Sequence, residues 1–439
     1  MTEQHHAEHH SKLRFLLRSA AALASTTVVT AGLGFVYWAV AARFFTAAAV
    51  GESSTAIAAM NLIAPLTLLG LGTLLIAELP TMSTGRGAMV STAAVLTGLV
   101  ASVVAFGCAF ALPGDYLGLP GIGTPVVAAV FAAAVATQSI GLLLDQALLS
   151  LFGGGIQLRR NAVQAVVKLV LLIVFALTIP RFGALAIFGS WLAANVVSLA
   201  FAALLLVRRH GVAVHRLIPD LRSLDGLHFD AARHHVLNTA LLVPYFAMPI
   251  VANVVLGSER AAYLYAAWSV AGAVFFVPVS LSTALFASGA RDSGTFLLEF
   301  RKTLRYSLLA SAAAAVVIVL FGRWVLAIFG PAYADAGYAP LVVMCLGGLG
   351  LIIKDHHVAL ARVTDDVGRE ALLVGVLSVA EVAGAAVGAV RGGLTGLTAG
   401  WLSAIALGAV VYGPRVWRAY RGRMDASAHP LSGREAAAQ

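Results

Sequence analysis

Four ionisable residues that could take part in transport lie inside long apolar stretches of this sequence: Asp145, Lys168, Asp355 and Glu381. A charge in such a stretch is costly, and it is usually paired or functional. Two interpretations are open. These side chains either form structural ion pairs and extend toward the interface, or they line a polar route and sense a coupling ion. Lys168 and Asp145 lie in neighbouring stretches, so we expect that they can pair with each other.

Three arginines are placed where they could bind a diphosphate. Arg14 and Arg18 are four residues apart and share one face of the first predicted helix. Arg233 opens the seventh apolar stretch. Arginine binds phosphate oxygens through paired N–H groups, so we expect these three residues to receive a lipid diphosphate at the cytoplasmic mouth. The alternative is that they only orient the chain in the membrane.

Uncharged polar and aromatic residues could line the same route. Aromatic rings in the first and seventh stretches could stack on sugar rings, although Tyr and Trp also collect at bilayer interfaces for amphipathic reasons. The interfacial interpretation suits Trp191 and Trp401 better. The residues that we expect to line the route are Tyr37, Asn61, Tyr245 and Asn253.

The sequence carries no signature of covalent chemistry. It has no phosphate-binding glycine loop, no nucleophile elbow and no metal-ligand spacing, and its outer-loop acids are scattered singly. Its two cysteines, Cys108 and Cys345, lie in apolar stretches and do not suggest a disulfide. We therefore expect no enzyme activity, no metal and no cofactor. The basic residues flank apolar stretches, which indicates membrane lipids as partners and not nucleic acid.

The elements that must position these residues are membrane helices. The chain has 439 residues, of which 60% are hydrophobic and 11% charged, and its mean hydropathy is +0.90. A membrane span needs about 20 apolar residues. The sequence predicts an all-α polytopic protein with twelve spans, at 18–42, 53–78, 88–112, 124–150, 161–180, 184–207, 236–258, 262–290, 303–329, 339–360, 371–390 and 394–414.

The distribution of positive charge predicts the topology. With both termini in the cytoplasm, 24 of the 29 Lys and Arg residues fall in cytoplasmic segments. Cationic loops resist translocation, so this arrangement of a multi-pass cell-membrane protein is favoured. The five that fall outside are Arg43, Arg181, Arg260, Arg323 and Arg391.

The chain divides into two similar halves. Arg181 and the pair Trp191-Leu192 recur 210 residues later as Arg391 and Trp401-Leu402, and Asp145 likewise meets Asp355. An even number of spans in each half predicts parallel repeats about an axis along the membrane normal. The expected segments are a cytoplasmic tail at 1–17, an N-lobe at 18–207, a cytoplasmic linker at 208–235, a C-lobe at 236–414 and a basic tail at 415–439. The alternative is that similar helices align through composition alone.

Two prolines occupy matching places in the halves. Pro65 in the second span and Pro278 in the eighth are 213 residues apart. Proline inside a helix frees a carbonyl and bends the helix. We expect both to kink helices beside a cleft that opens to each face in turn, although passive packing kinks would look the same.

Two segments carry a resemblance to a known family. The stretch 35–79 resembles the first two spans of oligosaccharide flippases of the Wzx type, with a small-residue outer turn and a Gly-Leu-rich end to the second helix. The stretch 320–347 is similar to their junction between spans nine and ten, and 259–270 to their entry into span eight. The resemblance covers roughly 15–418.

The resemblance implies both a fold and a function. The superfamily of these flippases also contains multidrug and toxic-compound exporters (MATE) and lipid II flippases. The resemblance implies two six-helix lobes in a V-shaped, MATE-like arrangement. The cargo would be an undecaprenyl-diphosphate-linked oligosaccharide for surface polysaccharide synthesis, moved by alternating access. The protein would act as a monomer, coupled to an H⁺ or Na⁺ gradient or to the membrane potential.

Two features of this chain depart from the families that it resembles. Coupled drug exporters usually carry a carboxylate in span one or seven, and neither span has one here. Lipid II flippases typically have two further spans, whereas a basic tail follows the twelfth span here. The alternatives are a MATE-like exporter of a small amphiphilic drug or natural product, and an integral-membrane enzyme such as a glycan polymerase.

Overall fold

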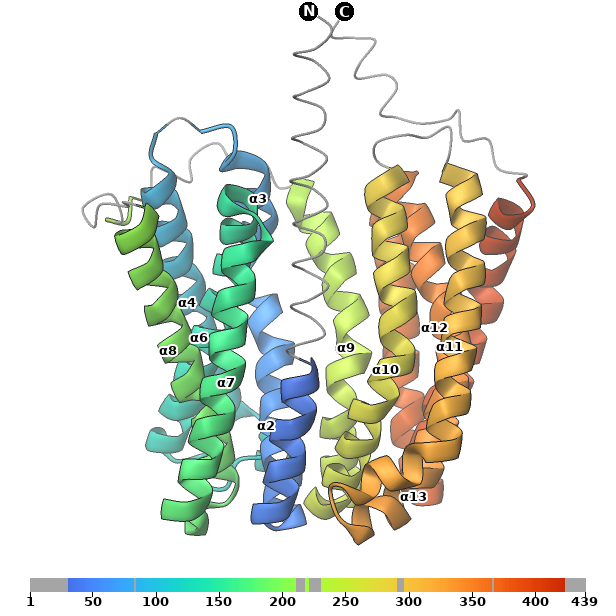
Figure 1. The fold of residues 1–439 in the computed structure, drawn as a ribbon, viewed down its shortest axis with the longest axis horizontal. Coiled ribbons are helices and arrows are strands. Elements are labelled where there is room, and N and C mark those ends of the chain that lie inside the picture. The colour runs from blue at the N-terminus through green and yellow to red at the C-terminus, as the bar shows by residue number, and fades with distance from the viewer. Residues whose placement is uncertain are drawn as a thin grey trace, which may run out of the picture. The chain divides into compact units, whose positions relative to one another are not determined.

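In this computed structural model the described residues are 31–82, 84–210, 218–220, 230–289, 296–364 and 367–422. Every regular element among them is a helix. The chain divides into two compact units, Met1–His235 and Val236–Gln439. We call them the N-unit and the C-unit. Within each unit, long helices run side by side (Figure 1).

The N-unit is organised around one central helix. Helix α6 contacts α2, α3, α4, α7 and α8, so residues on its several faces meet partners from all of them. The helices of this unit are an unlabelled one at Ala31–Phe44, then α2 (Ala47–Leu66), α3 (Leu71–Glu78), α4 (Arg86–Ala111), α5 (Gly114–Leu117), α6 (Pro125–Phe152), α7 (Gly154–Thr178), the 3₁₀ turn η1 (Pro180–Phe182) and α8 (Ala184–His210).

The C-unit is organised around α12, which packs against α10, α11 and α13. Leu237 and Ala240 of α9 pack onto the same core through Val358 of α12. The helices of this unit are α9 (Asp230–Leu256), which begins just before the division, α10 (Ser258–Gly289), α11 (Phe296–Ala327), α12 (Pro331–Val363) and α13 (Val367–Tyr420).

The predicted second span, 53–78, is broken in the structure. Helix α2 ends at Leu66, one residue after Pro65, and a turn precedes α3 at Leu71. The turn places Gly70 at φ 82°, a left-handed conformation that glycine adopts without strain. Leu69 also has a positive φ, of 50°, and two successive residues with positive φ end the right-handed helix here. Pro278, in contrast, lies within the continuous helix α10.

The two last predicted spans form one long element with a kink. Gly392 and Gly393 have non-helical dihedrals inside α13, between the predicted spans 371–390 and 394–414. The two halves of α13 pack closely at glycines, because a Cβ built on Gly388 would lie 2.0 Å from the Gly396 carbonyl oxygen. Small residues allow membrane helices to approach closely.

Ten helices in the described chain are long and apolar enough to cross a membrane, with α13 counted once across its kink. The helix Ala31–Phe44 is a shorter apolar one. Large apolar side chains stay exposed on outer faces, as on α11, where Leu320 is 61% and Trp324 67% exposed. Such faces suit contact with lipid. The predicted all-α polytopic fold is confirmed.

Candidate functional site

A buried ion pair joins two helices of the N-unit. Arg160 of α7 donates from Nε and Nη2 to the two carboxylate oxygens of Asp145 on α6, at 2.8 and 2.7 Å. Arg160 also donates to Asn161 at 2.9 Å and to Ser198 of α8 at 3.4 Å. Gly141 makes room, because a Cβ there would lie 3.0 Å from the guanidinium. The fork geometry and the extra hydrogen bonds compensate burial of both charges.

The expected pairing of Lys168 with Asp145 is therefore wrong, and the helix hairpin explains why. Helices α6 and α7 are antiparallel neighbours joined at Gly153. Asp145 lies eight residues before the joint and so lies level with residues 160 and 161. Lys168 lies seven residues beyond that level, about 10 Å further along the helix at 1.5 Å per residue.

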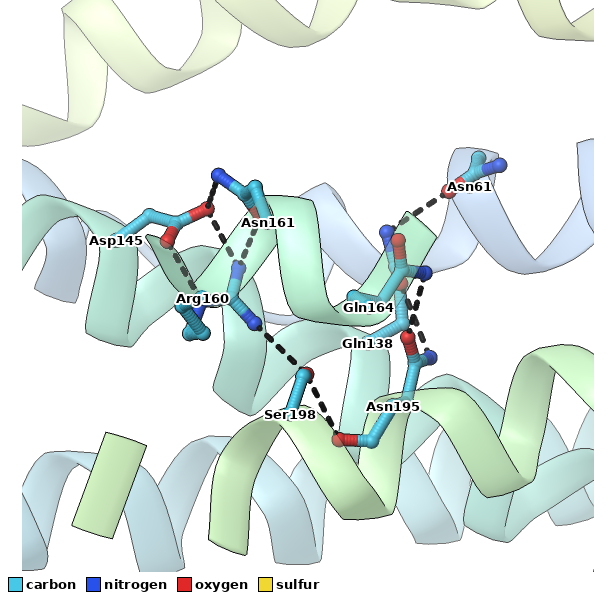
Figure 2. A network of polar contacts seen from close by, with 8 residues as sticks. All are labelled: Asn61, Gln138, Asp145, Arg160, Asn161, Gln164, Asn195 and Ser198. Atoms are coloured by element: carbon cyan, nitrogen blue, oxygen red, sulfur yellow. Dashed lines mark hydrogen bonds and ion pairs between the residues drawn. The ribbon is translucent and has the colours of Figure 1, made fainter. Parts of the chain in front are cut away.

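Four amide side chains form a directional relay beside this pair (Figure 2). Gln164 of α7 donates to Asn195 of α8 at 3.1 Å, and Asn195 donates to Gln138 of α6 at 3.1 Å. Gln138 donates to Asn61 of α2 at 3.0 Å. Figure 2 shows Asn61 at one end of the network and Asp145 at the other. We call these four residues the amide relay.

The amide relay leaves hydrogen-bonding capacity at its ends. Each amide has two donors and an acceptor with two lone pairs. In the described part of the chain, no protein acceptor receives the Asn61 amide hydrogens and no donor reaches Gln164 Oε1. Asn61, Gln138 and Gln164 are half-buried. An amide whose donors or acceptor lack hydrogen-bond partners in a membrane helix costs free energy. The two ends of the relay therefore favour a ligand that bears hydroxyl groups.

The polar groups of α7 follow one helical face. Gln157, Asn161, Gln164 and Lys168 are spaced as i, i+4, i+7 and i+11. Such spacing keeps side chains on one side of a helix and spans about 16 Å, half of the hydrocarbon core. Gln157 Oε1 is buried and has no hydrogen-bond partner among the described residues. We call these four residues the polar stripe of α7, and it places polar side chains deep in the N-unit.

Lys168 lies at the end of this stripe between aromatic rings. Its Nζ is 3.8 Å from the Trp191 ring centroid and 5.0 Å from that of Tyr37. Lys168 is 5% exposed, and none of the hydrogen bonds or ion pairs of the described residues involves its ammonium group. Tyr37 is fully buried, and its hydroxyl donates to the Ile187 carbonyl at 3.0 Å.

The rings compensate only part of the cost of burying Lys168. A desolvated cation–π contact is worth about 2 kcal/mol. Burial of an ammonium group costs several kcal/mol even after relaxation. Lys168 thus remains an undercompensated positive charge in the described interior of the N-unit.

Glu381 of the C-unit is, in contrast, fully paired. Its Oε1 accepts from Lys354 Nζ at 2.7 Å, and its Oε2 accepts from Trp401 Nε1 at 3.2 Å. Both charged side chains are more than nine-tenths buried. Trp401 is 2% exposed, so the interfacial interpretation of this residue is wrong. Trp191 likewise contacts a buried charge.

A second buried carboxylate of the C-unit, Glu370, is also paired. It accepts from His357 Nε2 at 2.7 Å and from Arg415. Arg415 also donates to Thr364 at 2.7 Å. Three segments of the C-unit are thereby tied together by one carboxylate. Sequence reasoning did not select Glu370 or His357.

Asp355 is the carboxylate of α12 without such a partner. Its Oδ2 is buried and has no hydrogen-bond partner in the described part of the chain. Lys354 and Arg362 are near enough to act on it electrostatically. Arg362 itself donates to Asn238 of α9 at 2.7 Å.

The other predicted site residues are not brought together by the described structure. Tyr245 is 44% exposed, and its ring lies 5.6 Å from Trp268 within the C-unit. Asn253 is 7% exposed. Arg14 and Arg18 lie outside the described residues, as does the side chain of Arg233. Their role at a diphosphate site stays a prediction.

The structure adds residues that the sequence interpretation missed. Of the amide relay only Asn61 was selected, and Gln138, Gln164 and Asn195 were not. For Gln164 the signal was present, because the polar residues of 154–178 recur at i, i+4, i+7 and i+11. A test of helical periodicity for amides within this apolar stretch would have found Gln164, whereas Gln138 and Asn195 lie on other helices.

Comparison with known proteins shows similarity at the level of structure only. No protein-family profile and no curated protein matches the sequence. A multidrug resistance MATE family transporter of the MOP superfamily, in an inward-facing conformation, is similar with a TM-score of 0.66 at 14% identity, over 88% of this chain and 96% of that one. An outward-facing structure with the same description gives 0.63 at 15% identity, over 92% and 96%.

A third similar structure has a distinct description. A MOP superfamily transporter from Pyrococcus furiosus Vc1 (DSM3638), described as having a binding pocket of reverse polarity, gives a TM-score of 0.62 at 14% identity, over 91% of this chain and 96% of that one. The chain is thus a polytopic membrane protein of all-α class. Its fold is that of MATE-type transporters of the MOP superfamily, as expected, whereas the Wzx-type family and the cargo stay predictions.

Proposed function

We propose that this protein carries a lipid-linked oligosaccharide across the cell membrane by alternating access, without covalent chemistry. The lipid carrier would be undecaprenyl diphosphate, and the product would serve surface polysaccharide synthesis. The protein would act as a monomer in a multi-pass arrangement with both termini cytoplasmic, and an H⁺ or Na⁺ gradient or the membrane potential would drive it. The MATE-type fold supports transport, and the cargo is argued from the N-unit.

The observation that carries the proposal is the amide relay. A sugar presents many hydroxyls, each both donor and acceptor, and the free ends of the relay offer one of each. The relay contains no charge, so it suits a neutral polyhydroxylated group better than an organic cation. Its residues come from four helices, α2, α6, α7 and α8. Convergent polar groups from separate membrane helices commonly mark a substrate path.

A MATE-like exporter of small amphiphiles is the second candidate, because two of the similar structures are described as multidrug resistance transporters. Against it, residues 31–44 and 231–256 contain no carboxylate that could attract a cationic drug or a coupling proton. The buried charge of Lys168 would repel such a cation. Efflux of a cationic dye from loaded vesicles tests this alternative directly.

The test of the proposal is transport in reconstituted vesicles. The probe is a labelled undecaprenyl diphosphate that carries a short neutral oligosaccharide, and a sugar-cleaving enzyme added outside reports which leaflet it occupies. Gln138→Leu is expected to slow translocation about tenfold, since one lost hydrogen bond costs about 1 kcal/mol and the open relay leaves others unsatisfied.

Gln146→Leu provides the matched control on the same helix. Gln146 lies eight residues from Gln138, about 12 Å along α6, and its amide packs over Gly72 of α3. It takes no part in the amide relay, so this variant should transport at the wild-type rate. Wild-type vesicles that move the probe no faster than protein-free vesicles would refute the proposed function.

A further inference from the structure

Trp191 and Trp401 hold the same place in the two halves of the chain, 210 residues apart. Each faces a buried charged residue on the helical segment that precedes its own. Trp191 of α8 faces Lys168 of α7, and Trp401 in the second half of α13 faces Glu381 in the first half. The two halves therefore use one scaffold position to contact opposite charges.

In the C-unit this arrangement is closed. The Trp401 N–H donates to one oxygen of Glu381, and Lys354 donates to the other oxygen. The set consists of a cation, an indole N–H donor and one carboxylate that satisfies both. Its charge sums to zero.

Among the described residues of the N-unit, the acceptor of this set is missing. Lys168 supplies the cation, 3.8 Å from the Trp191 ring centroid. Trp191 Nε1 is buried and has no hydrogen-bond partner among the described residues. The position 210 residues before Glu381 is Leu171, one helical turn after Lys168. An apolar residue thus stands where the C-unit has its carboxylate.

We propose that Lys168 and Trp191 form a subsite for an anionic oxygen group of the cargo, which takes the part that Glu381 plays in the C-unit. The inference rests on the proposed function, because the anion belongs to the transported molecule. An ammonium group and an indole N–H are both donors, and an anion with several oxygens can accept from both. Two sources share this chemistry: the diphosphate of the lipid carrier and the carboxylate of an acidic sugar.

The test is stabilisation of the purified full-length protein by small anions. A ligand that binds the folded state raises the melting temperature in proportion to ln(1 + [L]/Kd). The probes are pyrophosphate, glucuronate and, as the neutral comparison, glucose. Pyrophosphate stabilisation assigns the subsite to the diphosphate, and glucuronate stabilisation assigns it to an acidic sugar.

Three variants remove or fill the subsite. Lys168→Gln removes the cation and should weaken anion binding about tenfold. Trp191→Phe removes the N–H donor but keeps an aromatic ring, and should weaken anion binding about threefold. Leu171→Glu supplies the missing carboxylate inside the protein and should abolish anion binding. Lys168→Gln removes an undercompensated charge, so it should fold as well as the wild type.

The controls repeat the same chemical changes elsewhere. Lys302→Gln and Trp324→Phe alter exposed residues of α11 and should leave the apparent Kd unchanged. Absence of anion stabilisation in the wild type, or equal Kd values in the wild type and Lys168→Gln, would overturn the subsite. A wild type that binds anions but moves no lipid-linked probe overturns the proposed function and leaves the subsite standing.

Discussion

The two halves of α13 pack so closely at glycines that one added methyl group should force them apart. A Cβ built on Gly388 lies 2.0 Å from the carbonyl oxygen of Gly396, and one on Gly400 lies 2.0 Å from that of Gly384. Ordinary contact begins at 3.4 Å, so each is short by 1.4 Å. Both obstructing atoms are backbone, which cannot rotate away as a side chain can.

The magnitude follows from two opposing terms. Alanine is favoured over glycine inside a helix by about 1 kcal/mol. Overpacking costs about 1–3 kcal/mol and more where the backbone must move. Since separation of the halves also loses dispersion contacts along the hairpin, we place the steric cost of Gly388→Ala at about 3 kcal/mol. The variant should lose about 2 kcal/mol of net stability after the helix gain.

Gly375 of the same helix supplies the control, because a Cβ there meets nothing within 4 Å. Gly375→Ala has only the helix-propensity gain and should stabilise the protein slightly. The measurement is the thermal unfolding midpoint of both variants in detergent. A unit of this size shifts by about 2–4 °C per kcal/mol, so the two variants should differ by about 6–12 °C.

The reasoning would be refuted by equal midpoints for the two variants. That result would mean that the hairpin opens at no cost, and that the close glycine contacts contribute nothing to stability. Gly388→Leu should widen the gap further, and a midpoint no lower than that of Gly388→Ala would contradict the steric explanation in the same way.

Three further predictions concern buried polar groups. Glu381→Gln should lower stability by about 3–5 kcal/mol, because it leaves Lys354 charged and unpaired. In thermal unfolding, changing both residues to Met should recover most of this loss. No recovery would contradict the ion pair between Lys354 and Glu381. Asp145→Asn should cost a similar amount by stranding Arg160, whereas an unchanged midpoint would argue against that pair. Tyr37→Phe should cost at least about 1 kcal/mol, because its hydroxyl hydrogen-bonds the Ile187 carbonyl and Ser190 Oγ. A stabilised variant in thermal unfolding would contradict this.

Much of the fold could be predicted because each membrane span is a long apolar stretch in the sequence. Hydropathy and length located the spans, and the kink at Gly392 and Gly393 falls between the two last predicted ones. The break after Pro65 was missed because the apolar character continues through it. Hydropathy reports burial in lipid and not helical continuity, so the combined signal of Pro65 and Gly70 was needed.

Less of the candidate site could be predicted, because pairing depends on helix level and facing direction. Asp145 was selected as a charge within an apolar stretch, but its partner Arg160 was not selected. Counting residues outward from the joint at Gly153 would have placed Arg160 beside it. The pairing of Glu370 with Arg415 has no such local rule, because the two residues are 45 positions apart in the sequence.

The amide relay was missed for a different reason. Attention to charge selected Lys168 and Asp145, whereas Gln138 and Asn195 are neutral. Only packing of α6 against α8 brings those two together. An amide in a span costs less than a charge, yet four that meet define a polar site as firmly as an ion pair does.

Comparison of the two halves at an offset of 210 residues shows matching residues at some positions and opposite charges at others. Asp145 and Asp355 are equivalent, but the position equivalent to Arg160 is Glu370, an acid. Asp355 therefore cannot form the pair that Asp145 forms, and Glu370 instead binds His357 and Arg415. If the halves arose by duplication, such an exchange of sign required new partners in one half. Those partners neutralise Glu370, whereas no carboxylate among the described residues pairs with Lys168 in the other half. This difference is the reason why the anion subsite is proposed in the N-unit and not in the C-unit.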